Sequence, residues 1–171
     1  MRLMLIIPLM LSFLLLGCVT HLGAPQSREE FVTKVQPGGF GRKAEHMTIN
    51  RPFNTVLSDL RSFSDKCLNV RVSRGANSRT HEVGGSTTYH PKFTSNGKKT
   101  SLSVQEEYGS KRANSGAPPG GLFVVVTELR PIGDSKTQID IYHLLKSELV
   151  DPMKEWITGE KHQCPSYERG S

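Results

Sequence analysis

The sequence predicts an α+β protein: an antiparallel sheet with two helices packed on one face, in a single domain after a flexible N-terminal tether. Three observations favour this class. One segment has its apolar residues at helical spacing, several later segments alternate apolar and polar residues, and a second helical segment closes the chain. The order strand, helix, several strands and helix is typical of α+β proteins.

The first helix is expected between Phe53 and Phe63. Its apolar residues recur at helical intervals, which places them on one face. Pro52 suits the first turn. This face is expected to pack against the sheet and to carry no chemistry. Its residues are Phe53, Val56, Leu57, Leu60 and Phe63.

The sheet is expected to begin with a short strand at 46–50 and to continue after the first helix. Alternation of apolar and polar residues predicts strands at 68–73, 98–106 and 138–143. Leu122 to Val126 are five apolar residues in succession, which predicts a central strand covered on both faces.

The dipeptide Gly84-Gly85 predicts a hairpin turn between strands at 79–83 and 86–90. That pairing would place His81 and His90 as diagonal neighbours, about 7–8 Å apart. Arg79 would lie beside them, and no third ligand is evident, so a zinc site is a weak hypothesis. We predict no metal ion and no cofactor.

The closing helix carries its apolar residues at 149, 153, 156 and 157, and Gly159 can cap it. Pro152 either kinks this helix or starts it, with Asp151 as the N-cap. Trp156 lies on the apolar face, so we expect a core residue rather than a platform on which a sugar stacks.

Residues 1–17 have the three parts of a secretory signal peptide. Arg2 is the positive residue, Leu3 to Leu16 carry no charge, and Gly17 is the small residue before Cys18. The uncharged run is too short to span a membrane, which takes about 20 apolar residues. An ordinary cleaved signal with a cysteine nearby is the alternative.

The stretch Leu15-Leu16-Gly17-Cys18 resembles the lipobox of the bacterial lipoproteins, over residues 1 to about 20 only. The resemblance implies cleavage after Gly17, a diacylglyceryl thioether on Cys18 and usually a third acyl chain. In Gram-negative members an Asp after the cysteine commonly retains the protein in the inner membrane. Val19 stands there, which favours the periplasmic face of the outer membrane. The inner membrane and the cell membrane of a Gram-positive organism are alternatives.

Residues 18–45 are expected to be the lipidated cysteine and a flexible tether, because glycine and proline are frequent and apolar residues are few. Residues 46–168 would form the periplasmic domain. The whole chain has a net charge of +6, with its basic residues scattered in pairs, as on a solvated surface. Nucleic acid is therefore not expected as a partner of this exported protein. The expected partners are the membrane, through the lipid anchor, and an envelope protein or an anionic glycolipid.

Cys67 and Cys164 remain after the anchoring cysteine, and an isolated pair in an oxidising compartment predicts a disulfide. A nucleophilic thiol is the alternative. It fits poorly, since Cys67 follows the last turn of a predicted helix and activated thiols favour helix N-termini.

Two further features are candidates for function. His143 shares a strand face with apolar residues and is expected in the core or at its margin, while Asp140 lies on the opposite face. The loop 108–121 is longer than a hairpin needs. Tyr108, Lys111 and Arg112 make it a possible contact surface, although disorder is the favoured explanation of its length.

We therefore expect a non-catalytic, lipid-anchored envelope protein that binds another envelope component: a protein machine, lipopolysaccharide or peptidoglycan. No enzymatic activity is expected. The first alternative is an envelope hydrolase with a dispersed His/Asp site. The second is a carrier with an apolar cavity between helix and sheet.

Overall fold

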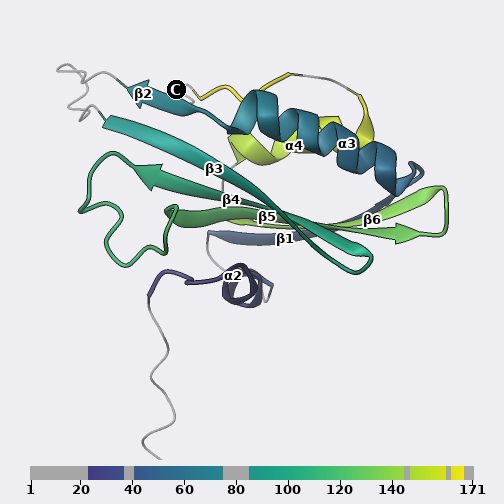
Figure 1. Cartoon of the computed structure of the whole chain (residues 1–171), viewed down its shortest axis with the longest axis horizontal. Coiled ribbons are helices and arrows are strands. Elements are labelled where there is room, and N and C mark those ends of the chain that lie inside the picture. Colours follow the sequence, from purple (N-terminus) through teal and green to yellow (C-terminus); the bar gives the residue numbers. More distant parts are fainter. Residues whose placement is uncertain (1–22, 37–40, 75–84, 145–146, 161–162, 168–171) are drawn as a thin grey trace, which may run out of the picture.

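The computed structural model describes residues 23–36, 41–74, 85–144, 147–160 and 163–167. They form an α+β domain around one six-stranded antiparallel sheet, in the order β1-β6-β5-β4-β3-β2. Figure 1 shows two helices, α3 and α4, on one face of this sheet and a third, α2, on the other. The fold class is as predicted, and the two predicted helices share one face of the sheet, but the third helix, α2 on the other face, was not predicted.

Each strand of the sheet is antiparallel to its neighbours. The first strand of the chain, β1, pairs with the last, β6, so the two ends of the domain meet in the sheet. The strands are β1 (Arg42–Ile49), β2 (Arg71–Arg74), β3 (Gly85–Asn96), β4 (Lys99–Tyr108), β5 (Leu122–Ile132) and β6 (Lys136–Leu144).

Both predicted helices are present. The helix α3 (Phe53–Phe63) buries the predicted face through Val56, Leu60 and Phe63, and α4 (Ser147–Thr158) contains Pro152. Together they cover a core that includes Leu102, Leu129 and Ile139 of the sheet. Trp156 is 4% exposed in this core, as predicted. None of the helices among the described residues is long and apolar enough to cross a membrane.

One predicted strand begins later than expected. A π-helical turn at Ser64–Leu68 extends α3, so Leu68 is buried in that turn and β2 starts only at Arg71. Alternation alone could not separate Leu68 from the strand, because an apolar residue at a helix end and one at a strand start give the same pattern.

The hairpin predicted at Gly84-Gly85 is wrong. The strand β3 pairs instead with β2, so that Ser86 faces Ser73 and Thr88 faces Arg71. Gly85 is itself the first residue of β3, and residues 75–84, with His81, lie outside the described part of the chain. The dipeptide signal failed because an earlier segment, β2, occupies that edge of β3.

The segment expected to be a tether contains regular structure. Residues Arg28–Val35 form α2, and β1 begins at Arg42, four residues before the predicted strand. Both therefore belong to the folded domain. The helix was missed because only three of its residues, Phe31, Val32 and Val35, are apolar.

The central strand β5 is covered on both faces, as predicted. Val125 and Leu129 face the core under α3 and α4, while Phe123 and Val126 face α2. A β-bulge produces this division, because Val104 pairs with Val125 but Gln105 pairs with Phe123, which leaves an extra residue in β5. Regular alternation would turn Phe123 towards α3, so the bulge supplies the apolar side chain on which α2 rests.

Candidate functional site

The helix α2 is fixed locally by its N-terminus. The Ser27 side chain accepts a hydrogen bond from the backbone N–H of Glu30 at 3.1 Å, which is an N-cap. Glu29 and Glu30 lie in the first turn and Lys34 in the last, as the helix dipole favours. A Ser followed three residues later by Glu is a sequence signal for a helix start, and it could have revealed α2.

A second, smaller core attaches α2 to the sheet. Phe31 and Val35 are each 1% exposed and pack on Phe123, Val126 and Tyr142. The rings of Phe31 and Phe123 lie with their centroids 6.1 Å apart and tilted by 40°. The helix thus covers only part of its sheet face, over β5, β6 and β1.

A pocket of about 470 Å³ lies beside this contact. One wall is α2, through Phe31 and Val35; another is the end of the sheet, through Leu122 and Leu144; and the chain at 23–25 closes a further side. The volume lies within the range of about 300–1,000 Å³ typical of small-molecule sites. The lining is mainly apolar, so the pocket suits an apolar group.

Among the described residues that line the pocket, only Lys34 and Arg42 are charged, and both are cations. The Lys34 ammonium forms an ion pair with Glu30 at 2.7 Å and donates to the Gly23 carbonyl at 3.0 Å. Arg42 donates from Nη1 to the Lys34 carbonyl at 3.1 Å and has no ion-pair partner among the described residues. Since Glu30 balances Lys34, the described residues leave one positive charge, that of Arg42, at the pocket mouth.

A smaller, polar pocket of about 280 Å³ shares Phe123 with the first. It lies between the start of α2 and the sheet, with Arg28, Lys92 and Gln105 in its lining and Pro119 from the loop that follows β4. Arg28 is paired with Glu29, while Lys92 has no ion pair among the described residues. Its lining could hold water or a small polar group.

The loop predicted as a contact surface is folded on itself. Asn114 accepts a hydrogen bond from the backbone N–H of Tyr108 at 2.9 Å and donates to the Tyr108 carbonyl at 2.6 Å. The Gln26 side chain donates to the Gly116 carbonyl at 2.8 Å, which ties the loop to the start of α2. Lys111 and Arg112 are exposed and line neither pocket described above, so the structure does not bring them to the candidate site.

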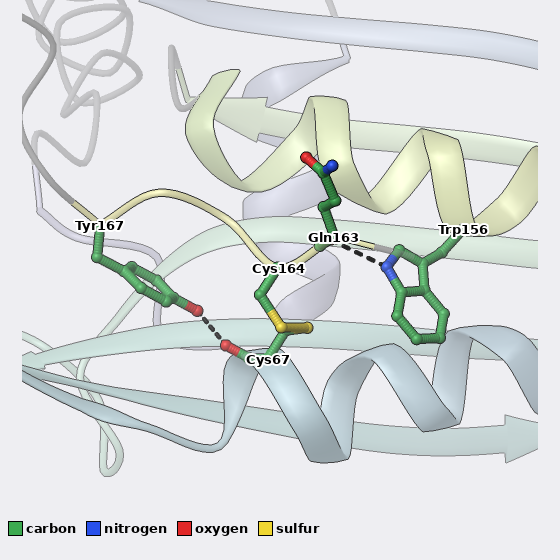
Figure 2. The surroundings of a disulfide bond; sticks show 5 residues. All are labelled: Cys67, Trp156, Gln163, Cys164 and Tyr167. Carbon is green, nitrogen blue, oxygen red and sulfur yellow. Dashed lines mark hydrogen bonds between the residues drawn. A yellow bond between two sulfur atoms is a disulfide. The ribbon is translucent and has the colours of Figure 1, made fainter. Parts of the chain in front are cut away.

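The predicted disulfide joins Cys67 and Cys164 across 97 residues, and the thiol-nucleophile alternative is therefore wrong. Figure 2 shows its surroundings: the Tyr167 hydroxyl donates to the Cys67 carbonyl, and the Trp156 indole donates to the Gln163 carbonyl at 3.1 Å. Burial raises the pKa of Tyr167 to about 12. The bond fixes the C-terminal segment over the helix layer and is structural.

Two histidine–carboxylate pairs near β1 and β6 lie on opposite faces of the sheet. His143 is 4% exposed and contacts Glu45 at 3.1 Å, as expected for a histidine in the core or at its margin. His46 contacts Asp140 at 2.8 Å on the α2 face. The buried Ser101 hydroxyl, on β4, has no hydrogen-bond partner in the described chain.

These residues do not assemble into a serine hydrolase triad. Ser101 lies on β4 and His46 on β1, which are three strands apart in the sheet. At about 4.8 Å between neighbouring strands the two are roughly 14 Å apart, far beyond hydrogen-bond reach. His90 contacts Glu107 at 2.9 Å, and no group of three potential metal ligands occurs among the described residues.

No protein-family model matches the chain, and no curated protein shows significant sequence similarity to it. The candidate site therefore stands on its geometry.

Proposed function

We propose that this protein is a non-catalytic binding protein of the cell envelope, anchored by lipid on Cys18. Its site would be the pocket beneath α2, which takes an apolar group of another envelope component. The observation that carries the proposal is the pocket of about 470 Å³, with its apolar lining and, among the described residues, a single unbalanced cation. A pocket of that composition suits an amphiphile better than a peptide or a sugar.

The position of the pocket in the chain supports this function. Gly23, in the pocket wall, follows Cys18 by only five residues. Five residues span at most about 18 Å when fully extended. A lipid on Cys18 would therefore keep the pocket close to the membrane, where amphiphiles are abundant. The proposed location is the periplasmic face of the outer membrane.

Two experiments in cells test the proposal. Metabolic palmitate labelling should mark the full-length protein and not the Cys18→Ala variant; label that survives in this variant would contradict the anchor. A photoreactive amino acid at position 24, in the pocket wall, should form adducts with the mass of a lipid. The matched position is 113, an exposed alanine in the loop. Lipid adducts of equal yield at both positions would contradict the pocket as the binding site.

The same pocket favours a carrier as a second candidate function. A carrier releases its ligand to an acceptor, whereas a binding protein that assembles with a membrane component retains it. Acceptor vesicles added to membrane-bound, ligand-loaded protein distinguish the two functions. Loss of the lipid adducts at position 24 favours a carrier, and an unchanged adduct yield favours a protein that retains its ligand.

A further inference from the structure

We infer that the ligand of this pocket is a single long-chain carboxylic acid, with its chain between α2 and the sheet and its carboxylate at Arg42. The inference rests on the proposed function and gives the chemistry of its ligand. It follows from the volume of the pocket, from its charge and from the donors that Arg42 has left.

The volume suits one acyl chain. A water molecule takes about 30 Å³ in the liquid, and if a methylene group is taken to be of similar size, 470 Å³ corresponds to a chain of roughly 15 carbons. Phe31, Val35 and Leu144 supply apolar walls along that space. Two chains of that length would need about twice the volume, so the pocket takes one chain and not two.

The charge at the mouth suits one carboxylate. Glu30 already balances Lys34, and Arg42 supplies the remaining positive charge. A ligand with one negative charge neutralises it, a neutral headgroup leaves the guanidinium unpaired, and a divalent phosphate brings a negative charge in excess. No described residue of the lining is acidic, so none of them would repel an anion.

The geometry of Arg42 also favours a carboxylate. Its Nη1 donates a hydrogen bond to the carbonyl of Lys34, at the end of α2. This contact holds the Arg42 side chain at the pocket mouth. The other guanidinium donors remain for a ligand, and a guanidinium pairs with a planar carboxylate through two parallel hydrogen bonds. Lys34 cannot do the same, because it is a point charge already held by Glu30 and Gly23.

The test uses the full-length protein in isolated cell membranes, without ATP or coenzyme A, so that no probe is attached to Cys18 by metabolism. Three photoreactive alkyne probes are compared: a C16 carboxylic acid, the C16 alcohol and a C8 acid. We expect the C16 acid to label peptides that contain Phe31 or Leu144. The C16 alcohol should label them roughly tenfold less, since one lost charge-assisted contact corresponds to about that factor. The C8 acid keeps its carboxylate but should label them at least about tenfold less, because its shorter chain buries much less apolar surface.

Variants separate the headgroup from the chain. Arg42→Gln should reduce labelling by the C16 acid roughly tenfold and leave labelling by the alcohol unchanged, while Arg42→Lys should keep part of the acid labelling. Lys98→Gln, an exposed cation in the β3–β4 turn, is the matched control and should label like the wild type. The fluorescence of Trp156, in the other core, reports whether each variant is folded.

Each remaining outcome overturns the inference. Equal labelling by acid and alcohol, or labelling unaffected by Arg42→Gln, would show that the headgroup is not recognised. The pocket-filling variant Ala24→Trp would then decide the wider proposal: labelling lost in Ala24→Trp but kept in Ala113→Trp would still support a lipid pocket. A probe crosslinked to the acyl chain of Cys18 within the pocket would show that the occupant is the protein's own anchor.

Discussion

Glu128 of β5 and Asp140 of β6 are directly paired on neighbouring strands, with their side chains on the same face of the sheet. These side chains are only 7% and 5% exposed. Two carboxylates in this relationship repel each other. Arg130 offsets the repulsion, since its guanidinium lies 3.2 Å from an oxygen of each. Lys99 and His46 contact the outer oxygens of the pair, at 2.9 and 2.8 Å. A row of alternating positive and negative side chains therefore stabilises the part of this sheet face that α2 does not cover.

Arg130→Gln should destabilise the fold, because it leaves two buried carboxylates without their shared cation. We expect a loss of about 1–3 kcal/mol in the free energy of unfolding, reduced because Arg130 is itself partly exposed. Urea unfolding measures it. Adding Asp140→Asn to Arg130→Gln should recover part of the loss, since the repulsion is then gone. Arg112→Gln, at an exposed loop arginine, is the control and should have no measurable effect.

The contribution of Glu45 to stability should disappear in acid. Desolvation alone would raise the pKa of Glu45, but hydrogen bonds from Lys154, Lys43 and His143 outweigh it and lower the pKa from 4.5 to about 2. A carboxylate with a lowered folded-state pKa stabilises the protein fully above pH 4.5, and this stabilisation is lost as the pH falls towards 2.

Glu45→Gln should therefore cost about 1–2 kcal/mol at pH 6, a figure reduced for solvent screening. Near pH 2.5, half a unit above the folded-state pKa, about a quarter of this cost should remain. Urea unfolding of both proteins across this range measures the difference. Glu160→Gln, at an exposed position after α4, should show no such trend. A cost for Glu45→Gln that stays constant with pH would contradict the lowered pKa.

Local patterns predicted the helix layer well, and they failed where distant segments meet. The α3 face was visible because Val56, Leu60 and Phe63 recur at helical spacing. The pairing of His46 with Asp140 could not be predicted from local patterns, because it depends on β1 pairing with β6, 94 residues away in the sequence. The pocket was equally hidden, because the bulge that turns Phe123 towards α2 has no signature in a run of apolar residues.

Removal of the disulfide should lower stability and release the C-terminal segment from Trp156. In the chain-entropy model a loop of 97 residues corresponds to about 4–5 kcal/mol, and measured losses are typically about 2–4 kcal/mol. Trp156 is the only tryptophan, and its indole donates to the Gln163 carbonyl, so its emission reports the release. We expect the emission maximum of Trp156 to shift in the double variant Cys67→Ser/Cys164→Ser. Tyr167→Phe is the milder variant and should cost about 1 kcal/mol, through loss of its hydrogen bond to Cys67.

Neighbouring residues of α3 should differ sharply in their effect. Leu60 is fully buried, so Leu60→Ala should cost about 2–5 kcal/mol. Arg61 is exposed, with its guanidinium 5.7 Å from the centre of the Phe93 ring, so Arg61→Ala should cost at most about 1 kcal/mol. Thermal unfolding compares the two variants. Equal losses would contradict the orientation of α3.

The disulfide also decides how the domain would respond to tension. The covalent loop that it closes contains β2 to β6 and α4, whereas α2, β1 and α3 lie outside it. A pull at Gly23 first loads α2, which is held by a small apolar cluster, and then β1, an edge strand paired only with β6. Chain extension from that end stops at Cys67, because the residues of the loop cannot be drawn out. Stretching from that end would therefore remove the wall of the pocket before it reaches α3 and the core beneath it, so the proposed binding site would be lost first.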